Sequence, residues 1–195
     1  ILEKECQSLI RRFITFNTLH RPFITLKWAE SADRFIDIER TSGMPVILSS
    51  PLTSMLVHKK RAEADAIMVG RRTALLDNPS LTVRNWYGHN PTRVVLDRTL
   101  SLPNDLQIFD GNVPTLVFTE KKQPARTNIT YISIDFNHNP LEQIMEVLYQ
   151  QKIQSLLVEG GSQLLQSFIN DELWDEAYIE KCPSRLHSGV KAPQM

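Results

Sequence analysis

Short runs of apolar, β-type residues alternate with helical patterns along most of this chain. The runs predict strands at 23–28, 66–69, 93–97, 115–119, 131–135, 155–159 and 177–180, with a further short apolar run at 46–48. Because glycine, proline or polar residues bound most of these runs, they are typical of strands buried in a sheet. In the first strand, Lys27 shares a face with Thr25, while Leu26 and Trp28 point the other way.

Helical periodicity fills the gaps between the strands. Apolar residues at spacings of three and four predict helices at 1–20, 50–64, 140–151 and 162–169, and a helical segment follows Gly70. In the first helix the predicted apolar face consists of Leu2, Cys6, Leu9, Ile10 and Phe13. Strands that alternate with helices favour an α/β fold with many parallel neighbours.

Composition narrows the class of protein. The 195 residues are 42% apolar and carry 22 basic and 22 acidic side chains, which fits one ordinary domain and argues against a nucleic-acid or membrane-surface partner. No apolar run approaches the length of a membrane span, and no secretory signal pattern is present. Since Cys6 and Cys182 form no CxxC pair, we expect two reduced thiols in a cytoplasmic protein.

Two glycine turns follow predicted buried strands. Gly70-Arg71-Arg72-Thr73 offers a tight turn, free N–H groups at a helix start and two guanidinium groups, which suit a phosphate, although a plain surface turn is the alternative. In Leu157-Val158-Glu159-Gly160-Gly161-Ser162, the glutamate and the glycines lie where a parallel sheet binds ligands. The alternative there is a glycine-rich helix start with an exposed glutamate.

Two further features have both a structural and a functional interpretation. The segment from Asp77 to Arg84 is rich in turn-forming residues, and Arg84 is either a surface cation or a ligand contact. Lys27 interrupts an apolar strand and lies on a solvated face or in a polar cleft. The five histidines lack metal-ligand spacing, so we expect surface or loop histidines and no metal site.

Together these segments resemble one family. The motifs are Arg21-Pro22 with Thr25-Leu26-Lys27, Ser31-Ala32-Asp33, Ser49-Ser50-Pro51, Arg61-Ala62 with Asp65-Ala66-Ile67, Gly70-x-x-Thr73, Asp77-Asn78-Pro79-x-Leu81-Thr82-Val83-Arg84, Arg93-Val94-Val95-Leu96-Asp97, Val158-Glu159-Gly160-Gly161, and Gly189 to Pro193. In this order they resemble the reductase domain of the bifunctional riboflavin-biosynthesis deaminase/reductase. The resemblance implies a dihydrofolate-reductase-like α/β fold, with a mostly parallel central sheet flanked by helices.

The resemblance also implies a domain organisation. Residues 1–20 would be a linker helix or the tail of a preceding deaminase domain, and 21–195 would be a reductase domain that lacks its C-terminal strand or strands. The zinc signature of that deaminase, H-x-E with a later P-C-x-x-C, has no match in the sequence. We therefore expect a deaminase domain elsewhere in the parent chain, no metal here, and a homodimer, as is common in this family.

By resemblance, the reaction is the NADPH-dependent reduction of the ribosyl group of 5-amino-6-(5-phosphoribosylamino)uracil to a ribityl chain. Lys27 and Glu159 would manage the proton that ring opening requires. Arg61, Leu81, Arg84 and Glu159 would contact the substrate, with both arginines on its 5′-phosphate. NADPH would contact Ala29, Ile47, Thr73, Asp77, Arg98, Gly161, Ser162, Gln163, Leu164, Leu165, Gln166 and Ser167.

Two positions depart from the family pattern. Arg34 stands where the family usually has glycine, so the turn at Asp33 is expected to be reshaped, and Ile47 replaces a tryptophan beside the cofactor. Two alternatives therefore stay open: a pterin or folate reductase of the same fold, and a non-catalytic paralogue used for dimerisation. Arg61 with Arg84 favours the sugar phosphate over a pterin, which lacks that group.

Overall fold

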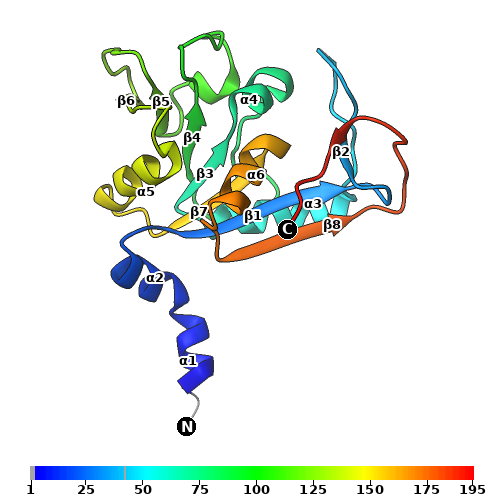
Figure 1. The fold of residues 1–195 in the computed structure, drawn as a ribbon, viewed down its shortest axis with the longest axis horizontal. Coiled ribbons are helices and arrows are strands. Elements are labelled where there is room, and N and C mark those ends of the chain that lie inside the picture. Colours follow the sequence, from blue (N-terminus) through cyan, green and yellow to red (C-terminus); the bar gives the residue numbers. More distant parts are fainter. Residues whose placement is uncertain (1–2, 42) are drawn as a thin grey trace.

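A single parallel sheet organises the computed structural model, which describes residues 3–41 and 43–195. Its seven strands lie in the order β6-β5-β4-β3-β7-β1-β8 (Figure 1). Each pairing between neighbouring strands in this sheet is parallel, which confirms the α/β prediction. The strands are β1 (Phe23–Glu30), β3 (Ala66–Val69), β4 (Thr92–Leu96), β5 (Thr115–Thr119), β6 (Ile129–Ser133), β7 (Ser155–Gly160) and β8 (Glu176–Lys181).

Helices and an ordered loop bury both faces of the sheet. Apolar residues of α5 (Pro140–Gln150) and α6 (Ser162–Asn170) form one core with the face that carries Leu26. The opposite face packs against α4 (Arg71–Asp77) and a loop that contains a short 3₁₀ turn (Gln107–Phe109). At the β1–β8 end, α3 (Pro51–Ala62) contacts that second face through polar side chains. Burial on both faces explains why the strands have apolar runs rather than alternation.

The N-terminal segment differs from its prediction. Two helices, α1 (Glu3–Leu9) and α2 (Arg11–Leu19), replace the single helix expected at 1–20. Their predicted apolar face is wrong: Cys6 and Ile10 are exposed, Leu9 is 85% exposed and Phe13 57% exposed, and Leu2 lies outside the described residues. Phe16 is buried instead, with its ring 4.6 Å from that of Tyr149 in α5. The reason is tertiary, since α2 meets the domain near its C-terminal end while α1 projects away (Figure 1).

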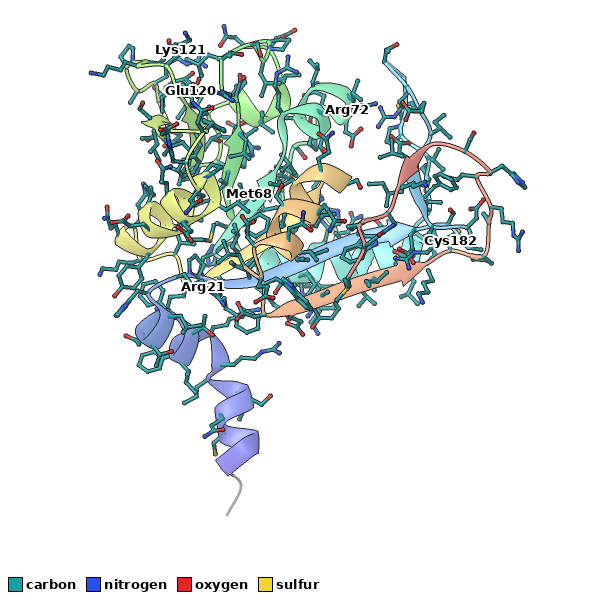
Figure 2. The ribbon with its side chains drawn as sticks, in the orientation of Figure 1. Arg21, Met68, Arg72, Glu120, Lys121 and Cys182 are labelled. Atoms are coloured by element: carbon teal, nitrogen blue, oxygen red, sulfur yellow. The ribbon has the colours of Figure 1, made fainter. Side chains whose placement is uncertain are left out.

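Several short elements around the ends of the sheet also differ from those predicted by the pattern of apolar residues. The apolar run at 46–48 is irregular rather than a strand, and β6 begins two residues before the predicted start at 131. A two-stranded antiparallel pair, β2 (Phe35–Asp37) with β9 (Val190–Lys191), is absent from the prediction because so few residues show no period. Cys182, in the loop between β8 and β9, and Cys6 are free thiols (Figure 2).

Carboxylates fix the strands at their amino ends. The Asp175 carboxylate accepts the backbone N–H of Ile24 at 2.7 Å and both terminal nitrogens of Arg21. Asp65 accepts the N–H groups of Gln154 and Ser155, each at 2.9 Å, where β7 begins. Such charge-assisted bonds hold the register of β1, β3 and β7.

Within the described parts of the chain, no helix has the length and apolar character needed to cross a bilayer.

Hydrogen bonds hold the turn that contains Asp33 and Arg34. Arg34 adopts a left-handed conformation with φ of 65°, and its N–H donates to the Ser31 carbonyl at 2.9 Å. The Asp33 carboxylate accepts the Ser31 hydroxyl and the N–H groups of Leu186 and His187, and these bonds lower the pKa of Asp33 to about 2. Hydrogen bonds therefore stabilise Arg34 in a conformation that usually favours glycine.

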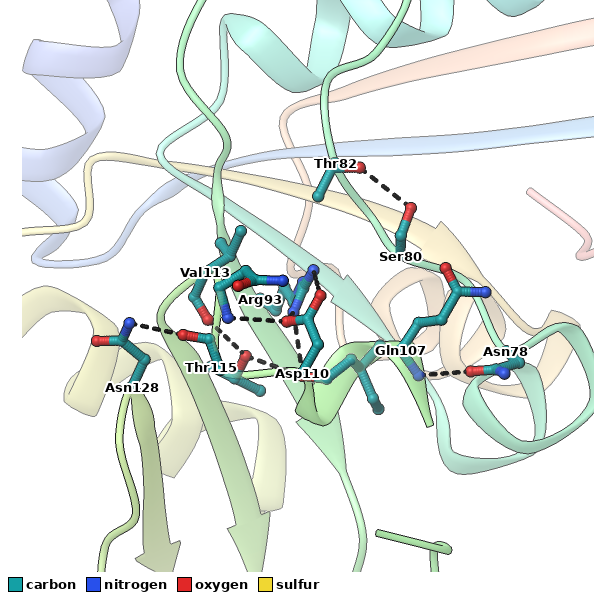
Figure 3. Close-up of polar contacts among 12 residues, drawn as sticks. Asn78, Ser80, Thr82, Arg93, Gln107, Asp110, Val113, Thr115 and Asn128 are labelled. Atoms are coloured by element: carbon teal, nitrogen blue, oxygen red, sulfur yellow. Dashed lines mark hydrogen bonds and ion pairs between the residues drawn. The ribbon is translucent and has the colours of Figure 1, made fainter. Parts of the chain in front are cut away.

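A buried arginine stabilises the loop that covers the second core. Arg93 of β4 is fully buried, and its guanidinium donates to Asp110 at 2.7 Å and to the Ile108 carbonyl at 3.3 Å (Figure 3). The hydrogen bond from Arg93 is the largest influence on Asp110 and lowers the pKa of its carboxyl. The pair therefore ties β4 to the loop between β4 and β5.

We predict that Asp110→Ala lowers the free energy of unfolding by about 2–3 kcal/mol at neutral pH, because it leaves the buried Arg93 guanidinium without its countercharge, with the Ile108 carbonyl still accepting one bond. Since folding lowers the pKa of Asp110, the stabilisation is complete above the ordinary value of 3.8 and is lost as pH falls through the lowered value. Urea unfolding at pH 7 and in acid measures both effects. Asp105→Ala, an exposed aspartate in the same loop, is the control. Equal stability of the two variants at pH 7 would contradict the assignment.

Candidate active site

A cleft of about 540 Å³ opens at the carboxyl ends of β1 and β7. Its floor includes Lys27 and Glu159, and its walls come from α4, the first turn of α6, β9 and the irregular segment 45–49. Parallel strands bring their carboxyl ends to one edge of a sheet, which is where open α/β folds bind ligands. The volume suits a small ligand or part of a dinucleotide.

Lys27 and Glu159 come from adjacent strands and both line the cleft. The parallel register of β1 and β7 is regular up to Leu26 and Val158, the residues that precede them, and β7 is irregular at Glu159 where it pairs with β3. Lys27 and Glu159 both belong to the face of the sheet on which α3 lies. Of the two positions that the sequence left open for Lys27, the structure shows the polar cleft, since the side chain is half-buried and lines the cavity.

The carboxylate of Glu159 pairs with Arg61, near the end of α3. Arg61 Nε donates to Oε1 at 3.0 Å and Nη2 to Oε2 at 2.6 Å, while Nη1 donates to the Thr82 carbonyl at 3.2 Å. The two side chains are only 12% and 8% exposed. Attraction to Glu159 outweighs the effect of burial and raises the pKa of Arg61. The ion pair of Glu159 is therefore with Arg61. Lys27 lines the same cleft as Glu159.

His58 connects this pair to Arg84. The ring of His58 is buried, contrary to the expectation of a surface histidine, and its Nδ1 accepts the backbone N–H of Arg84 at 3.1 Å. Burial first, and then the positive charges of Arg61 and Arg84, lower the pKa of His58, so the ring is neutral at pH 7. The Arg84 guanidinium is exposed and donates to the Ser80 hydroxyl. The fold thus brings Arg61 and Arg84 together, as predicted.

Arg40 organises the opposite end of the cleft. Its guanidinium is almost fully buried, pairs with Asp37 at 2.7 Å and with Asp77, and donates to the carbonyls of Gly43 and Leu76. Burial acts against the Arg40 charge, but bonds from Asp77 and Asp37 outweigh it and raise the pKa. Arg40 therefore fastens the segment after β2 to the end of α4, and the sequence pattern gave no sign of it.

Most of the predicted cofactor contacts line this cleft. They are Ala29, Ile47, Thr73, Asp77, Gly161, Ser162, Gln163 and Leu165. A Cβ on Gly160 would lie 2.9 Å from the Thr73 side chain, and Gly161 has φ of 78° with a Cβ position 3.2 Å from the Thr73 hydroxyl. Only glycine permits this close approach of β7, α4 and α6. The cradle so formed fits the phosphates of a dinucleotide beside the start of a helix.

Other predicted site residues lie outside the cleft lining. Leu81 and Leu164 are buried in the two cores, and Gln166 and Ser167 bond within α6 and to the Gln194 carbonyl. Arg98 pairs with Glu120 and Asn137 on another loop. Arg71 donates to Ser101, while Arg72 lines the cleft beside the segment that follows β2 (Figure 2). Within residues 3–41 and 43–195, no group of three His, Cys, Asp or Glu side chains has metal-site geometry.

Comparison with known proteins identifies the family. The sequence model of the RibD C-terminal domain matches residues 22–184. The chain belongs to this family. The riboflavin biosynthesis protein RibD of Aquifex aeolicus is 30% identical over 97% of the chain, which covers 54% of that protein. A 2,5-diamino-6-ribosylamino-4(3H)-pyrimidinone 5′-phosphate reductase of the same organism is 27% identical over 85% of the chain and 78% of its own length.

Solved structures agree on the fold. A diaminohydroxyphosphoribosylaminopyrimidine deaminase/5-amino-6-(5-phosphoribosylamino)uracil reductase of Thermotoga maritima is 33% identical and has a TM-score of 0.87. The match covers 98% of this chain and 53% of that one, so the chain spans about half the length of such relatives. Dihydrofolate reductase of Enterococcus faecalis, at 15% identity and a TM-score of 0.51, shares the fold alone. The dihydrofolate-reductase-like architecture is thereby confirmed.

We predict strong coupling between Arg61 and Glu159 in a double-mutant cycle. Glu159→Ala leaves a buried guanidinium unpaired and should lower the free energy of unfolding by about 3–5 kcal/mol, whereas the double alanine variant should recover about 2 kcal/mol of it. Urea unfolding of the four proteins gives the coupling. The pair Arg98→Ala and Glu120→Ala, half-exposed on another loop, should couple by less than about 1 kcal/mol. A coupling that small for Arg61 and Glu159 would contradict the description.

Proposed function

We propose that this chain is an NADPH-dependent reductase that converts the ribosyl group of 5-amino-6-(5-phosphoribosylamino)uracil into a ribityl chain. The observation that carries the proposal is that Glu159 and Lys27 line one cleft whose walls include the glycine cradle. The names of the relatives at about 30% identity support the same reaction class.

The walls of the cleft suit a nicotinamide dinucleotide. Bound NADPH would supply the hydride that reduces C1′ of the sugar. Gly161 and the first turn of α6 would hold the pyrophosphate through backbone N–H groups, with Thr73 beside them. Ala29 and Ile47 would border the rest of the cofactor.

Lys27 would manage the proton at the sugar. When the furanose opens, the C1′–O4′ bond breaks, O4′ gains a proton and C1′ accepts the hydride. Of the two cations beside Glu159, Lys27 would be the proton donor, because the guanidinium of Arg61 does not release a proton near neutral pH. Glu159, held by two bonds from Arg61, would accept hydrogen bonds from the sugar hydroxyls.

The 5′-phosphate would bind beside His58. Arg84 offers an exposed guanidinium there, while Arg61 has most of its N–H groups on Glu159 and Thr82. We therefore assign the direct phosphate contact chiefly to Arg84, with Arg61 adding positive charge close by. A cytoplasmic location, a homodimer and a covalently linked deaminase domain also belong to this proposal. A pterin reductase and an inactive paralogue are the outcomes that would replace it.

We predict that the protein oxidises NADPH much faster with the phosphorylated ribosylaminopyrimidine than with its dephosphorylated analogue. Arg84→Ala should reduce that preference about tenfold or more, and Arg84→Lys should restore only part of it because an ammonium cannot form the bidentate pair. Steady-state kinetics with both substrates measures the preference. Arg185→Ala, an exposed arginine near β9, is the control. A preference unchanged by Arg84→Ala would move the phosphate site elsewhere, and no NADPH oxidation at all would overturn the proposed function.

We also predict that NADPH binds more tightly than NADH, by roughly tenfold, because Arg72 can pair with the added 2′-phosphate at the wall of the cleft. Arg72→Ala should bring the two dissociation constants together while leaving that of NADH nearly unchanged. Fluorescence titration measures both constants. Arg71→Ala is the matched control, since Arg71 is adjacent to Arg72 in the sequence but donates to Ser101 outside the cleft lining. Equal dissociation constants for NADPH and NADH in the unmodified protein would contradict the prediction.

A further inference from the structure

The charge of Lys27 needs a partner that Glu159 does not provide. Both carboxylate oxygens of Glu159 accept N–H groups of Arg61. Lys27 is half-buried on a central strand, where an ammonium without a facing negative charge is costly. Among the described residues, no carboxylate oxygen lies within 4.0 Å of its Nζ. The countercharge must therefore act from a neighbouring strand.

Glu180 of β8 occupies that place. In the parallel register of β1 and β8, Lys27 pairs with Tyr178 and Ala29 pairs with Glu180, so all four side chains share the face on which α3 lies. Glu180 is thus the diagonal neighbour of Lys27, one step nearer the carboxyl ends of the strands. Glu180 is therefore close enough for its charge to act on Lys27, although the two side chains form no ion pair within 4.0 Å.

Two hydroxyl groups fix the Glu180 carboxylate. The Ser49 hydroxyl donates to Oε2 and the Thr53 hydroxyl to Oε1, each at 2.6 Å. Ser49 belongs to the wall of the cleft, and Thr53 lies in the first turn of α3. Partial burial opposes ionisation of Glu180, but these bonds and the positive charge of Lys27 outweigh it and lower the pKa of the carboxyl. The Glu180 charge therefore has a fixed place on the face of the sheet that carries Lys27.

We propose that Glu180 is a positioning residue for Lys27: its carboxylate, immobilised by Ser49 and Thr53, supplies the negative charge that acts on the Lys27 ammonium in the cleft. The role in turnover rests on the proposed function, since it acts through the proton that Lys27 donates. A structural alternative exists, in which Glu180 only anchors the cleft wall at Ser49. The two roles differ in what they do to Lys27 itself.

Trace labelling with acetic anhydride tests the proposal on the chain without substrate. Glu180→Gln keeps the shape and an acceptor oxygen but removes the charge, so the neutral amine of Lys27 becomes more populated and reacts faster. We expect the labelling of Lys27, relative to the exposed Lys122, to rise about fivefold in Glu180→Gln and less than about twofold in Glu180→Asp. Ser49→Ala keeps the charge and should change the ratio by less than about twofold. Unchanged labelling in Glu180→Gln overturns the proposal in favour of the anchoring role.

Kinetics gives a second readout. Glu180→Gln should lower kcat for NADPH oxidation about tenfold and leave the KM for NADPH within about twofold, whereas loss of the anchored wall would raise that KM. Glu172→Gln, an exposed glutamate in the turn after α6, is the matched control. A raised KM with unchanged kcat would also overturn the proposal. If the unmodified protein oxidises no NADPH, the proposed function fails, and the labelling ratio alone decides the role of Glu180.

Discussion

Parallel, in-register pairing of β1 with β7 and β8 determines where the charged groups of the cleft lie. A slip of β1 by one residue would turn Lys27 toward the apolar core under α6, where no group could satisfy it. Asp65 and Asp175 prevent such a slip by accepting backbone N–H groups where β7 and β1 begin. Carboxylates at the amino ends of the strands therefore hold the positions of charged side chains at the carboxyl ends.

The charged groups in and around the cleft are of two kinds: buried groups that form ion pairs, and exposed guanidinium groups. On its floor, Glu159 is matched by Arg61, and at one end Arg40 is matched by Asp37 and Asp77. These pairs have little access to water, so removing either partner is costly and they remain paired. The guanidinium groups of Arg72, which lines the cleft, and of Arg84, which lies beside His58, are exposed. Arg72 donates to the Arg40 carbonyl and lies 4.0 Å from Glu39, and Arg84 donates to the Ser80 hydroxyl. Under the proposed function, these exposed groups would exchange such partners for phosphate, while Lys27 and Glu159 would handle the proton.

The sequence predicts what local chemistry determines. Apolar runs locate the strands of the main sheet, and Ser50 with Pro51 marks the start of α3, where the Ser50 hydroxyl accepts the Thr53 N–H. Glu159 was recognisable because it follows a buried strand and precedes two glycines. By contrast, the partnership of Arg61 with Glu159 joins residues 98 positions apart, and the burial of His58 depends on the loop that carries Arg84. Those facts come from strand order and helix packing, which a local pattern does not contain.

The two departures from the family pattern have unequal consequences. Arg34 adopts a left-handed conformation in the turn at Asp33 and donates to the Pro193 carbonyl at 3.2 Å, so it ties the residues beside β9 to the turn and supports the wall of the cleft. Ile47 is different: it is 82% exposed on the segment 45–49, where a tryptophan would cover much more area. Under the proposed function, an isoleucine there would offer less stacking surface to a planar ring of the cofactor than a tryptophan. The segment itself is tied to its surroundings by Arg40, which donates to the Gly43 carbonyl, and by Glu180, which accepts the Ser49 hydroxyl.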